Sequence, residues 1–507
     1  MKRLTCSFLL VTLVALAKPC AFGETSGDDQ RALHVLNRLT FGPRPGDLAN
    51  VKREGVEAFI QAQLHPQSLP EAPEVVDFVT NSKALNLTPI ELFKQYGPPA
   101  VKAQANMNDE PGVQKENQLT GQIRQNLFKT VYQDVSHARI LRALDSPRQL
   151  QEVMTDFWFN HFNIFANKGL DHVWVGSYEE QAIRPYALGK FKDLLKATCH
   201  HAAMLFYLDN WRNRSLSPSS ASKDNGSNEN YARELMELHT LGVDGGYTQK
   251  DVTELARILT GLGLPDPKRP LQLASVEQAG NERFGFYFDR KRHDFGDKVL
   301  LGHLIKGSGE GEIDEALALL ANSPATAHHI SYQLAQYFVS DSPPPSLVDK
   351  LASTFTKTDG DIRATLTVLF HSPEFLSKDC ENAKYKTPFR YLISALRAVG
   401  AQPTNYDALN GFLRMEGMPL YGCLTPDGYK NTMVAWLNPD MLLRRINFAT
   451  GLAMRRMPAV YSENANSQEL VATLGGAFSN KTTEAISKAP EPLKAALILG
   501  SPEFMKY

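Results

Sequence analysis

The stretch from residue 228 to residue 248, which reads NENYARELMELHTLGVDGGYT, constrains the fold more than any other part of the sequence. Apolar side chains recur in it at the three- and four-residue spacing of one helix face. Asn228 is a residue type that favours the start of a helix, and Gly242 one that favours its end. His239 falls on the apolar face and is therefore expected to be buried, whereas Glu234 borders that face.

The same helical spacing recurs along most of the sequence, so we expect a mainly α-helical protein. After the glycine turn, Thr248 and Asp251 have the spacing of a capping box that begins another helix. A serine followed by a proline, as at Ser146-Pro147, precedes several helical stretches and favours a helix start. We predict one large multi-helix domain over residues 30–507.

Three segments depart from this helical pattern. Residues 96–118 are polar and contain several prolines, which predicts a flexible insertion. Residues 212–227 are rich in serine and predict a disordered loop. Residues 284–301 begin with alternating phenylalanines and end with an apolar run from Val299 to Leu301, which predicts one small β-hairpin with His293 and Asp294 in its loop.

The first residues have the pattern of a secretory signal peptide. Lys2 and Arg3 precede an apolar run that ends at Ala17, and small residues then offer cleavage after Ala17 or after Gly23. An uncleaved membrane anchor is the alternative, but the run is shorter than the roughly 20 residues that a membrane span needs. We predict that residues 1–23 are removed and that the mature protein has no membrane span. Its location would be the periplasm or the medium.

Charge and cysteine content exclude two further classes of protein. Cleavage after Gly23 leaves 51 basic and 55 acidic residues, a net charge of −4, so we expect no nucleic-acid partner. Such a chain keeps only Cys199, Cys380 and Cys423, and no two of them have Cys-x-x-Cys spacing. A disulfide scaffold and a thiolate zinc site are therefore excluded as the basis of the fold. Whether two of the three cysteines pair stays open.

No familiar catalytic motif occurs in the sequence, but a set of ionisable residues suits a buried polar site. His161 lies within an aromatic stripe of its predicted helix, and His239 lies on the apolar face described above. Two neutral imidazoles suit a divalent metal such as zinc or iron. Glu234, His293 and Asp294 are the candidate catalytic groups beside these two metal ligands. We predict that His161, either Glu234 or His239, and the loop with His293 and Asp294 converge on one site.

The alternative is that these residues have no chemical role. A buried histidine commonly bonds a backbone carbonyl within a core, and the charged groups around it commonly form ion pairs. Under that interpretation His161 and His239 tie helices together without holding a metal. Spacing alone does not separate the two interpretations.

Several short sequence motifs, in their order and spacing, resemble those of the family of domain-of-unknown-function 1800 proteins over nearly the whole mature chain. The matching motifs are Leu36-Asn37-Arg38-Leu39-Thr40-Phe41-Gly42-Pro43, Phe157-Trp158-Phe159-Asn160-His161-Phe162, Ala203-Met204-Leu205 leading to Leu208-Asp209-Asn210, Asn228 to Tyr247, His293-Asp294 with Lys298 and Leu301-Gly302, and Ser372-Pro373-Glu374-Phe375. The family commonly has a proline where this chain has Ala202, so the local backbone is expected to differ there.

The resemblance implies a bacterial, usually exported, mainly helical protein without an established activity. It also implies a neighbouring gene for another exported protein, one related to the alkaline-phosphatase and sulfatase fold. Two functions follow as expectations. The favoured one is an exported protein whose buried polar centre binds or acts on an extracytoplasmic substrate. The alternative is a non-catalytic interaction or assembly protein that works with another exported protein.

Overall fold

The computed structural model describes residues 27–97, 129–215, 227–266, 272, 274, 276, 281, 283–457, 460–461, 466–476 and 478–507. The predicted signal peptide, most of the predicted insertion at 96–118 and most of the serine-rich loop at 212–227 lie outside these residues.

The described chain is mainly helical, as the sequence predicts. In the first half, mostly short helices follow one another closely: α1 (Gly27–Leu39), α2 (Asp47–Glu54), α3 (Val56–Leu64), η1 (Pro66–Ser68), α4 (Pro73–Asn81), α5 (Lys83–Asn86), α6 (Pro89–Tyr96), a helix over residues 129–145, α8 (Gln149–His161), α9 (Asp171–Ser177), the π-helical η2 (Tyr178–Ile183), η3 (Arg184–Tyr186), α10 (Phe191–His200), α11 (Ala202–Tyr207) and η4 (Asn210–Arg212). The second half continues with α12 (Asn230–Glu237), α13 (Gln249–Ile258), α15 (Gly311–Ala321), α16 (Pro324–Phe338), α17 (Pro345–Lys357), α18 (Ile362–Phe370), α19 (Pro388–Ala398), α20 (Tyr406–Met415), α21 (Met433–Trp436), α22 (Pro439–Ala453), α23 (Ser467–Thr473), α24 (Asn480–Lys488) and α25 (Glu491–Leu499).

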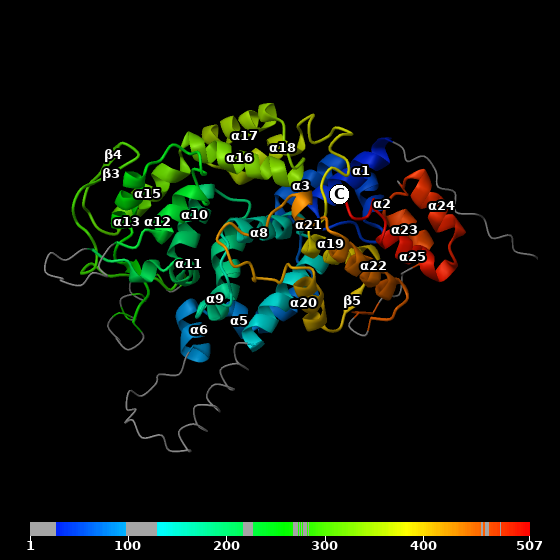
Figure 1. Ribbon diagram of the computed structural model, residues 1–507, viewed down its shortest axis with the longest axis horizontal. Coiled ribbons are helices and arrows are strands. Elements are labelled where there is room, and N and C mark those ends of the chain that lie inside the picture. Colours follow the sequence, from blue (N-terminus) through cyan, green and yellow to red (C-terminus); the bar gives the residue numbers. More distant parts are fainter. Residues whose placement is uncertain are drawn as a thin grey trace, which may run out of the picture.

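Along the longest axis, α13 and α15 lie at one end and α22 to α25 at the other, with α8 near the middle (Figure 1). Helices α16 to α18 cover the upper side in that view. One cluster of buried apolar side chains extends through the molecule, with members from Val35 to Met505. The elements on both sides of α8 therefore share a continuous core.

The predicted β-hairpin is wrong in its pairing. Within the described chain, β1 (Leu262–Gly263) pairs with β2 (Tyr287–Phe288), and β3 (Lys298–Leu300) pairs with β4 (His303–Ile305), both antiparallel. The run around Phe288 and the run around Val299 thus lie in different sheets. Strands of two or three residues carry too little pattern to specify a partner, so tertiary packing selects it. A third pair joins β5 (Gln402–Pro403) to β6 (Val460–Tyr461).

The local signals around the central helix are largely confirmed. The backbone amide of Asn230 donates to Oδ1 of Asn228 at the start of α12 (3.0 Å). Thr248 and Asp251 form the reciprocal capping box of α13. Helix α12 ends at Glu237, earlier than predicted, but Gly242 has the expected left-handed φ of 85°. A Cβ there would lie 2.9 Å from Nδ1 of His329, so close packing also favours glycine.

Helix α1 is fastened to distant parts of the sequence by buried polar groups. His34 bonds the carbonyl of Phe375 through Nε2 (2.8 Å), and Arg38 donates to the carbonyl of Cys380. Arg390 of α19 donates to the carbonyl of Thr40 (2.6 Å), and Arg397 of the same helix donates to that of Gly42 (2.6 Å). Residues 34–42 are therefore held in place by groups from residues 375–397.

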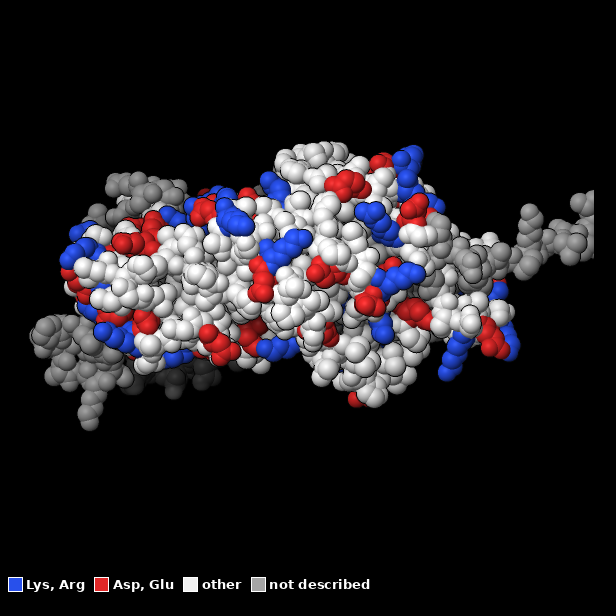
Figure 2. Space-filling model, turned by 90° about the horizontal axis from the view of Figure 1, so that it is seen from above, with Lys and Arg blue, Asp and Glu red and all other residues white. Residues whose placement is uncertain are grey.

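Surface and cysteine features bear on several of the expectations. On the face shown in Figure 2, basic and acidic side chains are interspersed and do not gather by sign. None of the helices in the described part of the chain combines the length and apolar character that crossing a bilayer requires. Cys199, Cys380 and Cys423 are buried free thiols, which answers the open question of their pairing.

Candidate functional site

The end of helix α8 forms the centre of the candidate site. The indole of Trp158 donates to the carbonyl of Ala187 (2.9 Å) and fixes this last turn in the core. His161 is the final residue of the helix and is buried, as predicted. Its Nε2 donates to the backbone carbonyl of His239 (3.2 Å), in the turn after α12. Its ring packs edge-on against that of Phe162 (4.5 Å between centroids).

Three imidazoles lie close together at this point. The ring centroids of His161 and His239 are 6.0 Å apart, and those of His161 and His329, from α16, are 6.4 Å apart. The amide of Gln333 donates to Nε2 of His329 (3.0 Å). The structure thus confirms that the first two histidines meet. The third was missed because the adjacent His328-His329 pair gives no clear sign of which ring faces inward.

Burial keeps these three imidazoles neutral. It lowers the pKa of His161 to about 3, with the neighbouring His329 acting in the same direction. It lowers the pKa of His239 well below its usual value and also lowers that of His329. Neither ring nitrogen of His239 has a hydrogen-bond partner among the described residues. Leaving the polar atoms of a fully buried imidazole without hydrogen bonds lowers the free energy of unfolding by roughly 1 to 3 kcal/mol.

A cleft of about 300 Å³ opens beside the histidine cluster and is lined by His161 and His329. One wall is a stripe of α16 that carries Gln333, Gln336 and Tyr337 in addition to His329. The opposite wall comes from residues 418–431, which link α20 to α21. The floor is aromatic, because Phe157 and Phe159 of α8 also line the cleft.

The charged groups of the cleft are balanced and largely paired. Three cationic and three anionic side chains line it: Arg139, Arg390, Lys430, Asp156, Glu237 and Asp427. Arg139 pairs with Asp156 (2.5 Å) and with the buried Glu179 behind the wall (2.8 Å). Lys430 pairs with Asp427 at the surface (2.6 Å). The side chains left to meet a ligand are therefore mainly neutral amides, imidazoles and aromatic rings.

Glu234 lies near this cleft without lining it. Its carboxyl is partly buried, and burial, followed by the charge of Glu237, raises its pKa. The charge of Asp427 also contributes to the increase. Both of these neighbours line the cleft, so the structure brings Glu234 into the vicinity of the histidine cluster.

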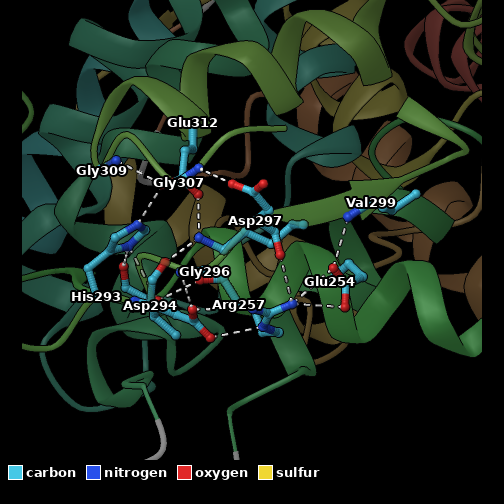
Figure 3. A network of polar contacts seen from close by, with 12 residues as sticks. Glu254, Arg257, His293, Asp294, Gly296, Asp297, Val299, Gly307, Gly309 and Glu312 are labelled. Atoms are coloured by element: carbon cyan, nitrogen blue, oxygen red, sulfur yellow. Dashed lines mark hydrogen bonds and ion pairs between the residues drawn. The ribbon is translucent and has the colours of Figure 1, made fainter. Parts of the chain in front are cut away.

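His293 and Asp294 belong to a different network, shown in Figure 3. His293 bonds the carbonyl of Thr260 through Nδ1 (2.7 Å) and Glu312 through Nε2 (3.0 Å). The carboxylate of Asp294 accepts from Nε of Arg257 on α13 (2.9 Å). These bonds fasten the loop before β3 to α13 and α15.

The same network contains a fully buried ion pair. Nζ of Lys298 lies 2.5 Å from Oε2 of Glu312, and both side chains are fully buried. Burial acts to raise the pKa of Glu312, but hydrogen bonds from Lys298, the Gly309 amide and His293 outweigh it and leave that pKa below its usual value. Glu312 is thus an ionised acceptor at the centre of the network.

The five predicted site residues therefore fall into two groups. His161 and His239 are in contact, with Glu234 nearby, whereas His293 and Asp294 form the second group. Among the contacts of the described residues, no hydrogen bond, ion pair or ring contact joins the groups. In the described ranges, no three His, Cys, Asp or Glu side chains have an arrangement that could hold a metal ion. The metal and catalytic roles stay predictions.

Comparison with known proteins gives one match. A family model described as "Protein of unknown function (DUF1800)" matches residues 34–506. No curated protein and no solved structure matches the chain. At Ala202, where a proline was expected from the resemblance, the backbone amide donates to the carbonyl of Phe284 (2.8 Å). A proline could not make that bond.

Proposed function

We propose, from the premise that this chain belongs to the DUF1800 family, that it is an exported protein that binds a neutral polar ligand in the cleft beside His161. Family membership assigns no activity, so the proposal depends on the cleft itself. The observation that carries it is the meeting of two neutral imidazoles, His161 and His329, with several amides and aromatic rings at one concave surface. Export rests on the pattern of residues 1–23 alone.

The charges of the cleft favour a neutral ligand. An anionic ligand would need a cation with free donors, but Arg139 is committed to Asp156 and Glu179, and Nη2 of Arg390 donates to the carbonyls of Asn37 (2.7 Å) and Thr40 (2.6 Å). A cationic ligand would need a free carboxylate, but Asp156 and Asp427 are paired with Arg139 and Lys430, and Glu237 accepts from the hydroxyl of Tyr247 (3.2 Å). Amide and imidazole groups both donate and accept hydrogen bonds, which suits hydroxyl and amide groups of a ligand. Aromatic walls suit its apolar faces.

The geometry supports binding more directly than acid–base catalysis. A general base works best when its pKa lies near the operating pH, whereas that of His161 is about 3. A metal bound to His161 and His239 would give the site Lewis-acid chemistry, and two neutral imidazoles suit zinc or iron. Metal analysis of protein purified without a polyhistidine tag tests this. One ion per chain that is lost in a His239→Ala variant supports a metal centre.

Ligand binding is testable by thermal shift and calorimetry. The panel contains the neutral disaccharides maltose and cellobiose, the neutral amide N-acetyltyrosinamide, and the anions glucose 6-phosphate and citrate. We expect a neutral compound to raise the melting temperature and the anions to have no effect. Gln333→Ala should abolish that rise. His328→Ala, an exposed position on the same helix, is the control and should keep it.

Stabilisation by the anions alone would contradict the proposed neutrality of the ligand. A rise that Gln333→Ala leaves unchanged would place the ligand elsewhere. Absence of binding across the panel, together with a metal-free protein, would favour the alternative function.

The alternative, an interaction or assembly protein, has its own support. Large apolar side chains are exposed near α21 and α22, with Val434 at 88%, Leu443 at 58% and Leu437 at 53% exposure. Exposed apolar surface of this kind marks interaction sites when it is contiguous. A partner would be another exported protein, and the family resemblance points to one of alkaline-phosphatase or sulfatase type. Cross-linking in the native periplasm, lost in Leu443→Glu, would support it.

A further inference from the structure

Residues 418–431, which we call the strap, form one wall of the cleft and contain no helix or strand. Met418, Tyr421 and Tyr429 of the strap line the cleft. The strap follows Gly417, which has a positive φ of 76°, and includes Gly428, with a φ of 66°. It joins α20 to α21.

Two asparagines on either side of His161 hold the strap in place. The side chain of Asn160 makes a reciprocal pair with the backbone of Tyr429, donating to its carbonyl (2.9 Å) and accepting from its amide (2.7 Å). The amide of Asn163 donates to the carbonyls of Cys423 (3.1 Å) and Thr425 (2.9 Å). These four bonds connect the cleft floor directly to the opposite wall.

Close packing reinforces the contact at Asn160. A Cβ added to Gly428 would lie 2.2 Å from the carbonyl oxygen of Asn160, so only glycine lets the strap approach α8 this closely.

Both ends of the strap are also bonded to the surrounding structure. At the first end, the Tyr421 hydroxyl donates to the buried Glu179 (3.1 Å) and the Ala166 amide donates to the Tyr421 carbonyl (3.0 Å); at the other, Lys384 and Trp436 donate to the carbonyls of Asn431 (2.6 Å) and Lys430 (2.7 Å). Tyr132 and Tyr207 contribute one bond each. Their hydroxyls donate to the carbonyls of Leu420 (3.1 Å) and Leu424 (2.9 Å).

The first part of the strap is buried, with Met418, Leu420 and Tyr421 in the apolar core, whereas most of the part from 424 to 430 is exposed or half-buried. Leu424 is 69% exposed, and Thr425, Asp427 and Lys430 are also exposed. A segment held mainly by hydrogen bonds near the surface opens at a lower free energy than the core does. Residues 424–430, which we call the outer strap, are therefore expected to separate from α8 more readily than the buried first part of the strap or the surrounding helices.

We infer that the outer strap, residues 424–430, is a gate at the edge of the cleft and that Asn160 and Asn163 are positioning residues that hold it closed. The inference rests on the proposed function, because a gate implies a ligand that passes it. Opening detaches Tyr429 from Asn160 and widens the cleft beside His161, while Tyr421 stays bonded to Glu179. The end of α8 and the residues after it therefore have two functions, since His161 faces the cleft while Asn160 and Asn163 hold the opposite wall.

The three free thiols provide an internal assay for this motion. Cys423 lies in the strap, whereas Cys199 and Cys380 lie in the surrounding core, and all three are buried. Modification by N-ethylmaleimide under native conditions, followed by mass spectrometry, measures how often each becomes accessible. We expect Cys423 to react at least about tenfold faster than the other two, because its exposure needs only the adjoining outer strap to open.

Asparagine variants sharpen the test. Asn163→Ala removes both bonds to the carbonyls beside Cys423 and should accelerate its modification by about tenfold to a hundredfold, leaving Cys199 and Cys380 unchanged. Asn160→Asp keeps the acceptor for the Tyr429 amide but loses the donor, so its effect should be smaller than that of Asn160→Ala. Asn447→Ala, at an exposed position on α22, is the control and should change nothing.

The inference is overturned if Cys423 in the wild-type chain reacts at the same rate as Cys199 and Cys380, since its exposure would then need global unfolding. It is also overturned if Asn163→Ala accelerates all three thiols equally. Hydrogen exchange of the Tyr429 amide gives a second measurement that does not depend on the variants. The assay uses no ligand, so its outcome is independent of whether the panel compounds bind.

Discussion

Replacing Lys298 with methionine should destabilise the protein more than any charge removal at the surface of the same hairpin. Lys298 and Glu312 are fully buried and 2.5 Å apart, and Lys298 also donates to the carbonyl of Asp294. Methionine keeps much of the apolar stem but leaves a buried carboxylate without its main cation. Breaking a buried pair in this way typically costs about 3 to 5 kcal/mol. Because His293 still bonds Glu312 (3.0 Å), we expect the lower end of that range.

The matched control, Lys306, directly follows β4. Lys306 pairs with Asp297 at 2.6 Å, but its side chain is 72% exposed, so Lys306→Met should cost at most about 1 kcal/mol. Denaturant unfolding followed by circular dichroism compares the two variants. A double variant, Lys298→Met with Glu312→Met, should lose less than the sum of the single variants, because no charge is then left buried.

Equal unfolding midpoints for Lys298→Met and Lys306→Met would refute this account of the network. The same variants also separate structure from chemistry. If Lys298→Met is destabilised but still binds a cleft ligand with unchanged affinity, then His293 and Asp294 stabilise the fold and take no part in ligand binding. If binding is lost while the fold persists, the two groups of candidate residues cooperate in a way that the contacts do not reveal.

Three further predictions follow from the sequence and the cleft. His161→Ala should cost about 2 to 4 kcal/mol, because the His239 carbonyl loses its donor and the packing against Phe162 is lost; an unchanged melting temperature would show that the ring is not packed as described. Acid should destabilise the protein through the same residue. The pKa of His161 falls from the usual 6.5 to about 3 on folding, so below about pH 6.5 the unfolded chain binds a proton that the folded chain does not. The contribution of His161 to the free energy of unfolding is therefore complete above about pH 6.5 and declines toward pH 3. At pH 5 the loss from His161 is about 2 kcal/mol. Denaturant titrations at pH 7 and pH 5 measure it, and a His161→Gln variant with the full wild-type pH dependence would contradict it. Finally, exported protein should begin at Lys18 or Glu24, and N-terminal sequencing that finds Met1 would disprove cleavage.

Helices and several of their start and stop signals could be predicted from the sequence because these signals are local, although α12 ends earlier than predicted. The capping box of Thr248 and Asp251 involves residues three apart, and the left-handed conformation of Gly242 needs only its own backbone. The pairing of the short strands could not be predicted in the same way. Val299 pairs with Leu304, five residues later, and not with the aromatic run before it, because strands this short take the partner that packing provides.

The site was partly predictable for the same physical reason. The inward directions of His161 and His239 follow from the apolar faces of two helices, and the two rings do meet. Periodicity cannot show that His329 joins them, since that depends on how α16 packs. Nor can it show that Asn160 bonds Tyr429, which lies 269 residues away in a segment without regular structure. Long-range polar contacts of this kind become visible only after folding.

The fastening of α1 to α19 has a consequence for the order in which this protein acquires its structure. His34 and Arg38 find their acceptors 341 and 342 residues later, and Gly42 is bonded by a guanidinium 355 residues away. A chain made from its N-terminus thus presents α1 long before its partners exist, and contacts of such separation form slowly. Until Arg390 and Arg397 arrive, the early helices expose apolar surface, which makes the nascent chain a substrate for chaperones. Completion of α1 is expected to be a late step of folding.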